Sequence, residues 1–474
     1  MITAQLLAVD PVPWARAQMA FTLATHIILV PLGVSWACMT LIANHRGIKK
    51  NDPDALLLAQ RWSKYMAVTF AVGAVTGTVL SFEFGLLWPS FTGQWGEVFG
   101  VAFAIEGLFF FLEAIFIAIY IYGWKRLRPW PHFWTGVPIV LAGIGGTVSI
   151  VSVNAWMNEP QGFTLDSTGN VTDVDPLKVI FNDAMPLQSL HMLVAAYLVG
   201  GFLVASVYAV GMLRGRRNRY HRLGFIIPFT VAAIATPVQM FVGDELARWV
   251  YNNEPIKFAA IELVPETTDD VPETLFGHLN SDGEVVGGFP IPDLASWLSD
   301  PSEGSSTVIQ GLNSFPEDER PTYHEANVVH LAWDLMVGLG TLLFLLSLWY
   351  AASWVFRRDM PRSRPFLWIA SGAGVAAVIA MEAGWVVTEV GRQPWIVFGH
   401  MKVEDAATTN DGVWITFLAI VAVYLTVAVT LVLILRSMSR RWREQAAEAE
   451  TDVPYGPREP VHPSTSHDEE VTVE

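Results

Sequence analysis

Histidine and glutamate side chains inside long apolar runs are the residues of this sequence whose types could do chemistry. An ionisable group at membrane depth is costly and is usually kept for a function such as metal binding or proton transfer. These positions therefore define the candidate sites. They include two histidines and four glutamates: His26, His191, Glu106, Glu113, Glu382 and Glu389.

Four potential metal ligands lie at similar depth in four different apolar runs. At about 1.5 Å per helical residue, His26 lies ~14 Å, His191 ~9 Å and Met336 ~12 Å from the same end of their runs. Glu389 lies just inside that end of its own run. Each has a plain structural alternative: hydrogen bonding between helices for a histidine, core packing for Met336, and an ion pair with Arg392 for Glu389. The shared depth favours a haem site over these alternatives.

The ligand types separate the haem classes. A histidine and a methionine fill both axial positions of an iron and give an electron-transfer haem, whereas a single protein ligand leaves a position open for a small molecule such as O₂. The sequence has no C-x-x-C-H segment, so any haem is held without a covalent bond. A haem–copper site would need a cluster of histidines that these runs lack, so we expect no copper.

Glu106 and Glu113 form a second candidate group. They are seven residues apart, which is two helical turns, so they share one helix face about 10 Å apart. Two protonatable carboxyl groups in line predict a proton relay toward the ligand cluster. The alternative is hydrogen bonding between helices by protonated glutamates.

The elements that position these residues are nine apolar runs, each able to cross a ~30 Å hydrocarbon core with about 20 helical residues. Of the 474 residues, 52% are hydrophobic and only 16% are charged, and the mean hydropathy is +0.38. Helices satisfy their own backbone in lipid, so we predict an all-α integral membrane protein with nine transmembrane helices. The spans are about 17–43, 62–88, 97–123, 133–156, 185–213, 222–250, 328–356, 366–390 and 412–436.

Lysine and arginine residues predict the orientation of the bundle. Of the 29 basic residues, 22 flank alternate connections on one side of it. This predicts an outside N-terminus and a cytoplasmic C-terminus. The chain then divides into helices 1–6 in residues 1–250, an external loop in 251–327, helices 7–9 in 328–443, and a disordered acidic cytoplasmic tail in 444–474.

Composition excludes several classes of protein. The single cysteine, Cys38, rules out an intrachain disulfide and a zinc-finger framework. The net charge of −16, with no basic patch, argues against a nucleic-acid partner. The first 18 residues lack a positive segment and a small-residue cleavage site, so we expect no removable signal peptide.

Several motifs carry a family resemblance. The segment GWVVTEVGRQPW at 384–395 resembles the signature of subunit I of the cytochrome bd-type quinol oxidases. Further matches cover about residues 10–400, and nine helices with an outside N-terminus agree with that family. These matches are VPLG at 30–33 after Arg16 and His26, AIEG at 104–107 with FLE at 111–113, PIKFAAIE at 255–262, and MVGLG at 336–340.

The resemblance implies two haem b groups and one haem d. His191 and Met336 would ligate the low-spin haem b. His26 and Glu389 would ligate the two high-spin haems, b and d, and which ligand belongs to which haem stays open. Trp385 would lie between haems.

The resemblance also implies a role in respiration at a bacterial cell membrane. Quinol would be oxidised at the outer face and O₂ reduced with cytoplasmic protons, which generates a proton gradient without pumping. Lys257 and Glu262 match quinol-binding positions of the external Q-loop, Arg392 would lie beside haem carboxylates, and Glu106 and Glu113 match proton-delivery residues. A second membrane subunit is implied as a partner, and small single-helix subunits are a further option.

Two features depart from the better-known members. Asp334 stands where they have an arginine, two residues before the ligating Met336. A carboxylate there would lower the potential of the nearby haem, whereas an arginine would raise it. The segment from Lys257 to Met336 also lacks the long insertion of some members. Which quinol binds is therefore left open.

Two other functions fit part of the pattern. A proton- or cation-coupled transporter would also use intramembrane glutamates, but it would be colourless, with sites near the midplane and broken helices. A quinone-binding membrane subunit without oxygen chemistry would bind haem b but show no haem d. The visible spectrum of the purified, reduced protein distinguishes all three.

Overall fold

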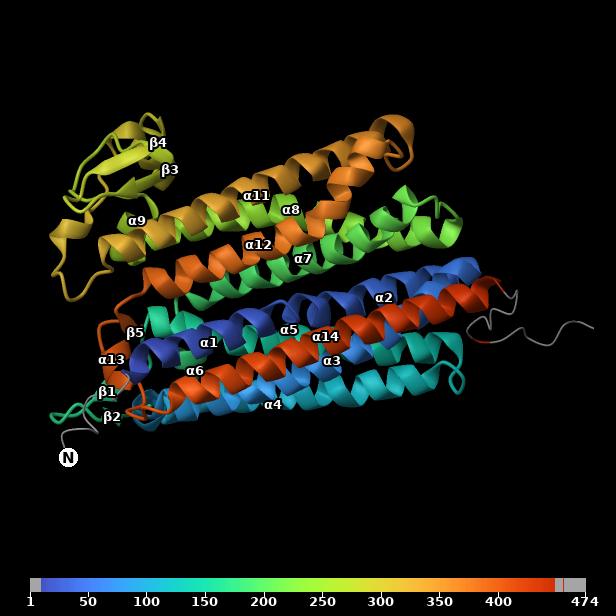
Figure 1. Ribbon diagram of the computed structural model, residues 1–474, viewed down its shortest axis with the longest axis horizontal. Helices are drawn as coiled ribbons and strands as arrows, with labels where there is room; N and C mark the ends of the chain where they lie inside the picture. The colour runs from blue at the N-terminus through green and yellow to red at the C-terminus, as the bar shows by residue number, and fades with distance from the viewer. Residues whose placement is uncertain (1–9, 448–454, 456–474) are drawn as a thin grey trace, which may run out of the picture.

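The computed structural model describes residues 10–447 and Tyr455. Within these residues, nine helical segments are long and apolar enough to cross a membrane, which confirms the predicted number and the all-α class. They lie side by side in one bundle (Figure 1). The first span comprises α1 (Pro11–Ile27) and α2 (Val30–Lys50). The others are α3 (Pro53–Leu87), α4 (Pro89–Gly123), α5 (Pro129–Asn158), α7 (Met185–Leu213), α8 (Arg219–Asn253), α11 (Tyr323–Arg357), α12 (Arg364–Gly391) and α14 (Val413–Ala447).

Proline and capping residues determine where many of these helices begin. Pro53, Pro89 and Pro129 each occupy the first helical position, where the missing N–H would have no partner in the helix anyway. At α11, the Thr322 hydroxyl accepts from the Glu325 N–H while the Glu325 carboxylate accepts from the Thr322 N–H, a reciprocal cap. The observed helices extend several of the predicted spans by a turn or more.

The first span is interrupted directly after His26. The Leu29 N–H donates to the His26 carbonyl at 2.9 Å, which tightens the turn at the end of α1. Pro31 lacks an N–H and its ring would clash with the carbonyl four residues earlier, which favours a break in the helix at this point. The break therefore lies beside one of the predicted ligands.

The two ends of the bundle differ in structure. One end carries all the short elements, while the connections rich in arginine and lysine lie at the other end (Figure 1). The strands form three two-stranded antiparallel sheets, which were not predicted. The short elements are β1 (Thr164–Leu165), β2 (Val171–Thr172), α6 (Pro176–Ile180), α9 (Pro255–Ile261), β3 (Glu273–Leu279), β4 (Val285–Ile291), α10 (Leu294–Ser299), β5 (Trp395–Val397), β6 (Met401–Lys402) and α13 (Val403–Ala406), with two 3₁₀ turns at Gly304–Ser306 and Leu312–Ser314.

Helix α14 extends into the predicted tail. Helix α14 continues to Ala447, so residues 444–447 are helical, and Arg440 pairs with Glu444 one turn later at 2.8 Å. Apart from Tyr455, the rest of the predicted tail lies outside the described residues. The Tyr455 hydroxyl lies 2.7 Å from Nδ1 of the buried His132.

Candidate functional site

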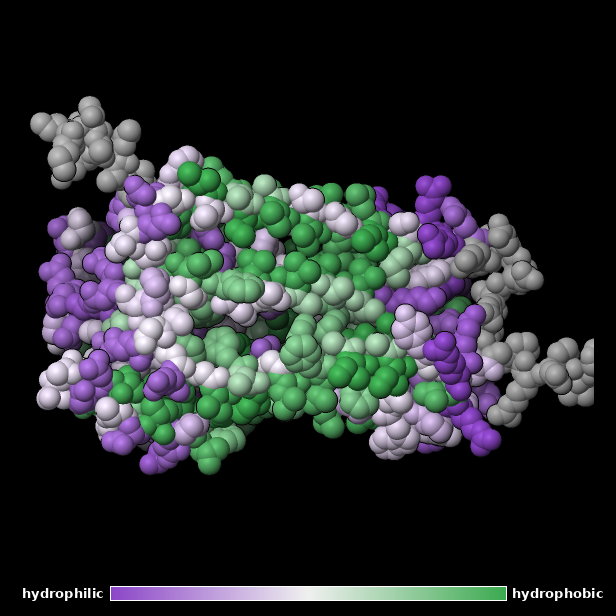
Figure 2. All heavy atoms as spheres, turned by 90° about the horizontal axis from the view of Figure 1, so that it is seen from below, coloured by the Kyte–Doolittle hydropathy of each residue, from purple (hydrophilic) through white to green (hydrophobic). Residues whose placement is uncertain are grey.

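A cavity of about 630 Å³ lies between α1, α2, α3, α4, α5 and α12. The apolar surface of the bundle is hollowed near its middle, and a few hydrophilic atoms show inside the hollow (Figure 2). The cavity brings together most of the predicted site residues, together with Glu382, which the sequence placed in the membrane without a role. These lining residues are His26, Glu106, Glu113, Trp385, Glu389, Arg392 and Glu382.

His26 is held by one ring nitrogen and leaves the other available. Its Nδ1 lies 2.9 Å from the Thr76 hydroxyl, and that hydroxyl is within 3.1 Å of the Val72 and Gly73 carbonyls. A hydroxyl that donates to a carbonyl accepts from the imidazole, which places the ring proton on Nδ1 and leaves Nε2 as a free ligand. A Cβ on Gly77 would lie only 3.0 Å from His26 Cε1, so this glycine allows the ring its position.

Glu389 and Arg392 form an ion pair, which was the structural alternative to a role of Glu389 as a metal ligand. Arg392 Nη2 donates to Glu389 Oε2 at 2.7 Å, and Asn154 Nδ2 donates to Glu389 Oε1 at 2.5 Å. Arg392 is only 4% exposed, and its Nε and Nη1 have no hydrogen-bond partner among the described residues. Unpaired buried donors are costly, so this guanidinium fits an anionic group in the cavity, such as a haem carboxylate.

The three other glutamates surround the same cavity. Glu106 and Glu113 share one face of α4, as their spacing predicted. Glu113 Oε1 lies 3.9 Å from the point where a Cβ on Gly143 would be, so this carboxyl lies close to α5. Glu382 Oε1 on α12 is buried without a hydrogen-bond partner in the described part of the chain. The cavity is therefore rich in groups that can take up and release protons.

His191 and Met336 lie outside the lining of this cavity. They belong to α7 and α11, which pack with α8 and α12 as a second group of helices. His191 has one ring nitrogen 2.9 Å from Gln239, while its Nδ1 is buried with no hydrogen-bond partner among the described residues. A Cβ on Gly243 would lie 3.4 Å from His191 Cε1, and one on Gly384 would lie 3.0 Å from Met336 Sδ. The spare imidazole nitrogen could bind a metal ion, and the two glycines allow the His191 ring and the Met336 sulfur their positions.

The two predicted quinol residues have separate surroundings. Lys257 on α9 is 6% exposed, and its Nζ donates to Asn158 Oδ1 at 2.8 Å and pairs with Glu254. Glu262, also 6% exposed, lies beside Glu273 of β3. Burial, reinforced by the Glu273 carboxylate, raises the pKa of Glu262 well above its usual range.

Asp334 and His330 belong to the surroundings of Glu262. His330 is fully buried; its Nδ1 donates to the Ile261 carbonyl at 2.6 Å, and its Nε2 lies 3.3 Å from Asp334 Oδ2. Asp334 Oδ2 also accepts from the Phe276 N–H at 2.5 Å. The aspartate that departs from the better-known pattern therefore connects α11 to the β3 strand.

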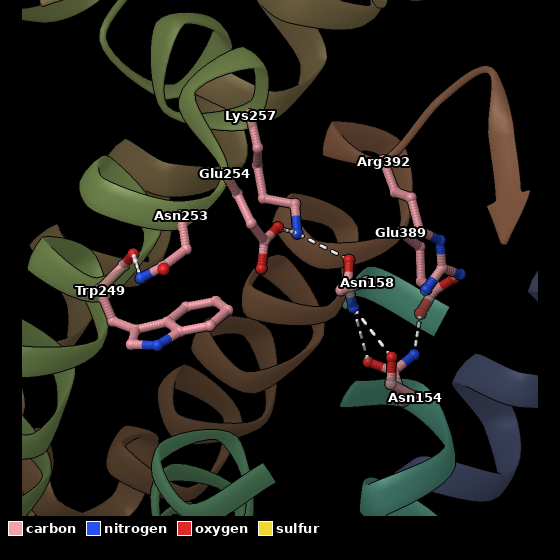
Figure 3. A network of polar contacts seen from close by, with 8 residues as sticks. All are labelled: Asn154, Asn158, Trp249, Asn253, Glu254, Lys257, Glu389 and Arg392. Atoms are coloured by element: carbon pink, nitrogen blue, oxygen red, sulfur yellow. Dashed lines mark hydrogen bonds and ion pairs between the residues drawn. The ribbon is translucent and has the colours of Figure 1, made fainter. Parts of the chain in front are cut away.

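Sequence reasoning missed the amide residues that link these groups. Asn154 and Asn158 lie near the end of α5, between Lys257 and Glu389 (Figure 3). Two asparagines four residues apart share a helix face, and their position at the end of an apolar run was the available signal. Asparagine amides are not ionisable, so a pattern of ionisable groups does not include them.

The fold and this arrangement define a multi-pass membrane protein in which ionisable groups from several helices converge on a buried cavity. Residues 14–442 match the family model for cytochrome bd terminal oxidase subunit I. The chain belongs to this family, which confirms the resemblance carried by the motifs. It is a component of a terminal respiratory oxidase, an oxidoreductase of the bacterial membrane, and the family implies haem cofactors and a partner subunit II.

Named relatives and a solved structure agree with the family. The chain is 32% identical over 434 residues to the "Putative cytochrome bd menaquinol oxidase subunit I" of Bacillus subtilis (strain 168). The alignment covers 90% of this chain and 96% of the relative. It is 24% identical over 497 residues to the cytochrome bd-II ubiquinol oxidase subunit 1 of Escherichia coli (strain K12), covering 91% and 96%. The structure of bd oxidase from Geobacillus thermodenitrificans is 35% identical with a TM-score of 0.85, covering 92% of this chain and 99% of that one.

Proposed function

We propose that this chain carries the haem groups of a quinol oxidase that reduces O₂ to water. The observation that carries the proposal is the convergence of His26, Glu389, Glu106 and Glu113 on one cavity, with the spare donors of Arg392 in its wall. The imidazole and a carboxylate could ligate haem iron, and the further protonatable groups around the same space could supply protons to O₂. Each O₂ converted to water consumes four electrons and four protons.

The residues divide into two haem-binding sets. His191 and Met336 would hold a low-spin haem b, and His26 and Glu389 would hold the high-spin haem b and the haem d between them. Bound haem would supply electron transfer at the first set and an open iron position for O₂ at the second. The proposal includes no copper, because a haem–copper site would need a cluster of histidines beside its haem ligands.

The protein's own groups would manage substrate and protons. Lys257 and Glu262 would bind the quinol head group or accept its protons at the end of the bundle that bears the short elements. Glu113 and Glu106 would pass protons to the cavity from the other end. Trp385 lines the cavity on the same helix as Glu389 and fits a place between haems.

The orientation explains how a gradient could form without a pump. The basic connections lie together at one end, which supports a cytoplasmic position for that end and an outside N-terminus (Figure 1). Quinol protons would leave outside while protons for water enter from the cytoplasm. Charge is then separated because electron donor and proton donor lie on opposite sides. The chain would act with a second membrane subunit, and with small single-helix subunits where these are present.

The test is the visible spectrum of the detergent-purified, reduced oxidase complex, combined with quinol-dependent O₂ uptake. The proposal expects signals of low-spin haem b, high-spin haem b and haem d, together with O₂ uptake when quinol is added. A colourless complex would favour a transporter. Haem b without haem d, and without O₂ uptake, would favour a quinone-binding subunit.

A further inference from the structure

We infer that Asn154 and Asn158 of α5 are positioning residues that hold Glu389 of the cavity and Lys257 of the Q-loop through one continuous chain of hydrogen bonds. The inference rests on the proposed function, in which Glu389 is an iron ligand and Lys257 binds quinol. It adds two residues that contact the proposed iron ligand Glu389 and the proposed quinol-binding residue Lys257, not iron or quinol itself.

The chain of contacts can be followed atom by atom (Figure 3). Lys257 Nζ donates to Asn158 Oδ1 at 2.8 Å, and Asn158 Nδ2 donates to the Asn154 carbonyl at 2.9 Å and lies 3.5 Å from Asn154 Oδ1. Asn154 Nδ2 donates to Glu389 Oε1 at 2.5 Å. Glu254 and Arg392 close the two ends by pairing with Lys257 and Glu389.

Asn154 and Asn158 can reach both Lys257 and Glu389 because they lie at the end of α5. Asn158 is the last residue of α5 and only 2% exposed, and Asn154 lies one turn earlier on the same face. Lys257 and Glu389 come from α9 and α12, far apart in the sequence. The end of α5 is the element that gives both side chains a polar partner, so it sets their positions relative to each other.

The chemistry of an amide suits this place. Asn158 accepts from an ammonium and donates to Asn154 at the same time, which only a side chain with both an acceptor and a donor can do. Bonds to charged partners are about twice as strong as neutral ones, so losing either end should be measurable. A purely structural role in closing the helix end would instead loosen every site at that end of the bundle together.

The test uses the intact oxidase complex with four variants. Asn154→Leu removes the donor to Glu389, and Asn158→Leu removes both functions of Asn158. Asn158→Asp keeps an acceptor for Lys257 but loses the donor to Asn154. Asn253→Leu is the matched control, because this exposed asparagine lies beside the chain of contacts and bonds only to the Trp249 carbonyl (Figure 3).

We expect two separable results from spectra and steady-state kinetics. Asn154→Leu should shift the bands of a high-spin haem and leave the low-spin haem b and the quinol KM unchanged. Asn158→Leu should raise the quinol KM about tenfold, since one bond to a charged group is lost, with kcat within about twofold. Asn158→Asp should keep the KM and show a smaller band shift in the direction of Asn154→Leu.

Three outcomes would overturn the inference: wild-type high-spin bands in Asn154→Leu, an Asn158→Leu KM equal to that of Asn253→Leu, or parallel loss of all haem signals in both variants. If Asn154→Leu does not assemble, Asn154→Ala should give the same band shift. Failure of the proposed function looks different. It would show as full high-spin haem in Glu389→Ala or an unchanged KM in Lys257→Ala, whatever the asparagine variants do.

Discussion

Two regions of this bundle each contain a histidine and a second residue that we propose as haem ligands, and the two regions differ in what surrounds these side chains. His26 and Glu389 face a cavity of about 630 Å³ that also contains three further glutamates and a partly unpaired arginine. His191 and Met336 lie in the packed group of α7, α8, α11 and α12, where glycines rather than an open cavity make room beside them.

The difference matches two kinds of iron chemistry. A closed site with two strong axial ligands suits electron transfer, since nothing else has to reach the metal. An open site with protonatable walls suits the binding of a small molecule and its reduction. The contrast between an open and a closed site is therefore the central claim of our proposal.

The largest effect is expected at the proton supply of the open site. Glu106→Gln keeps the shape of the side chain but cannot release a proton. We expect O₂ uptake to fall about 100-fold, the usual scale for a lost proton-transfer group, while all haem signals remain. Glu97→Gln on the exposed face of α4 is the control and should keep wild-type uptake. Normal uptake in Glu106→Gln would remove this residue from the proton route.

A smaller effect is expected at the arginine in the cavity wall. Arg392→Gln removes the buried donors that lack partners and also the partner of Glu389. We expect high-spin haem content to fall about tenfold through lost charge-assisted bonds, with low-spin haem b retained. Quantitative haem extraction with spectra measures both. Equal loss of low-spin and high-spin haem would contradict the division into two regions.

A variant that adds a single methyl group tests the packed region around His191 and Met336. In Gly384→Ala the new Cβ would lie 3.0 Å from Met336 Sδ, so the methionine must shift. We expect altered low-spin haem b bands and a lower temperature for their loss on heating, because crowding of a packed site costs about 1–3 kcal/mol. Gly372→Ala, on the same helix with nothing within 4 Å in this chain, is the control. Unchanged bands in Gly384→Ala would place Met336 away from the haem.

The smallest effect concerns the Q-loop, outside both regions. The pKa of Glu262 is raised by burial and by Glu273, so the folded loop holds this proton more tightly than an open loop would. Loop stability is therefore greatest at low pH and decreases as the pH rises from the usual carboxyl range through the raised pKa. His330 and Asp334 are the other ionisable groups nearby.

Limited proteolysis of the loop at increasing pH measures this effect. The wild-type loop should be cut faster as the pH rises. Glu273→Gln removes one source of the raised pKa and should flatten the curve. An identical pH dependence in the variant would show that Glu273 does not act on Glu262.

The sequence predicted the membrane-spanning helices better than the way in which they group. Hydropathy predicted the nine candidate spans that the described residues contain. The rotation of each helix about its axis and the identity of its neighbours depend on packing among distant segments of the chain. The spacing of residues along the sequence therefore could not predict that His26 lines an open cavity while His191 lies in a packed group of helices. The hydrogen-bonded chain through Asn154 and Asn158 also depends on such tertiary contacts.

In the Q-loop, too, the spacing of residues along the sequence did not predict their tertiary contacts. Lys257 and Glu262 are five residues apart and were expected to act together on quinol. They lie at opposite ends of the short helix α9, so Lys257 contacts Asn158 of α5 while Glu262 lies beside β3. The β3–β4 hairpin beside Glu262 turns at residues 280–283, and the Asp282-Gly283 pair there was a local turn signal that was overlooked.

Paired spectra of His26→Ala and His191→Ala in the purified, reduced complex test the contrast most directly. We predict that His191→Ala loses the low-spin haem b signal and keeps the high-spin signals. His26→Ala should lose a high-spin signal and keep the low-spin haem b. A full complement of low-spin haem b in His191→Ala, or loss of the same signals in both variants, would contradict the account.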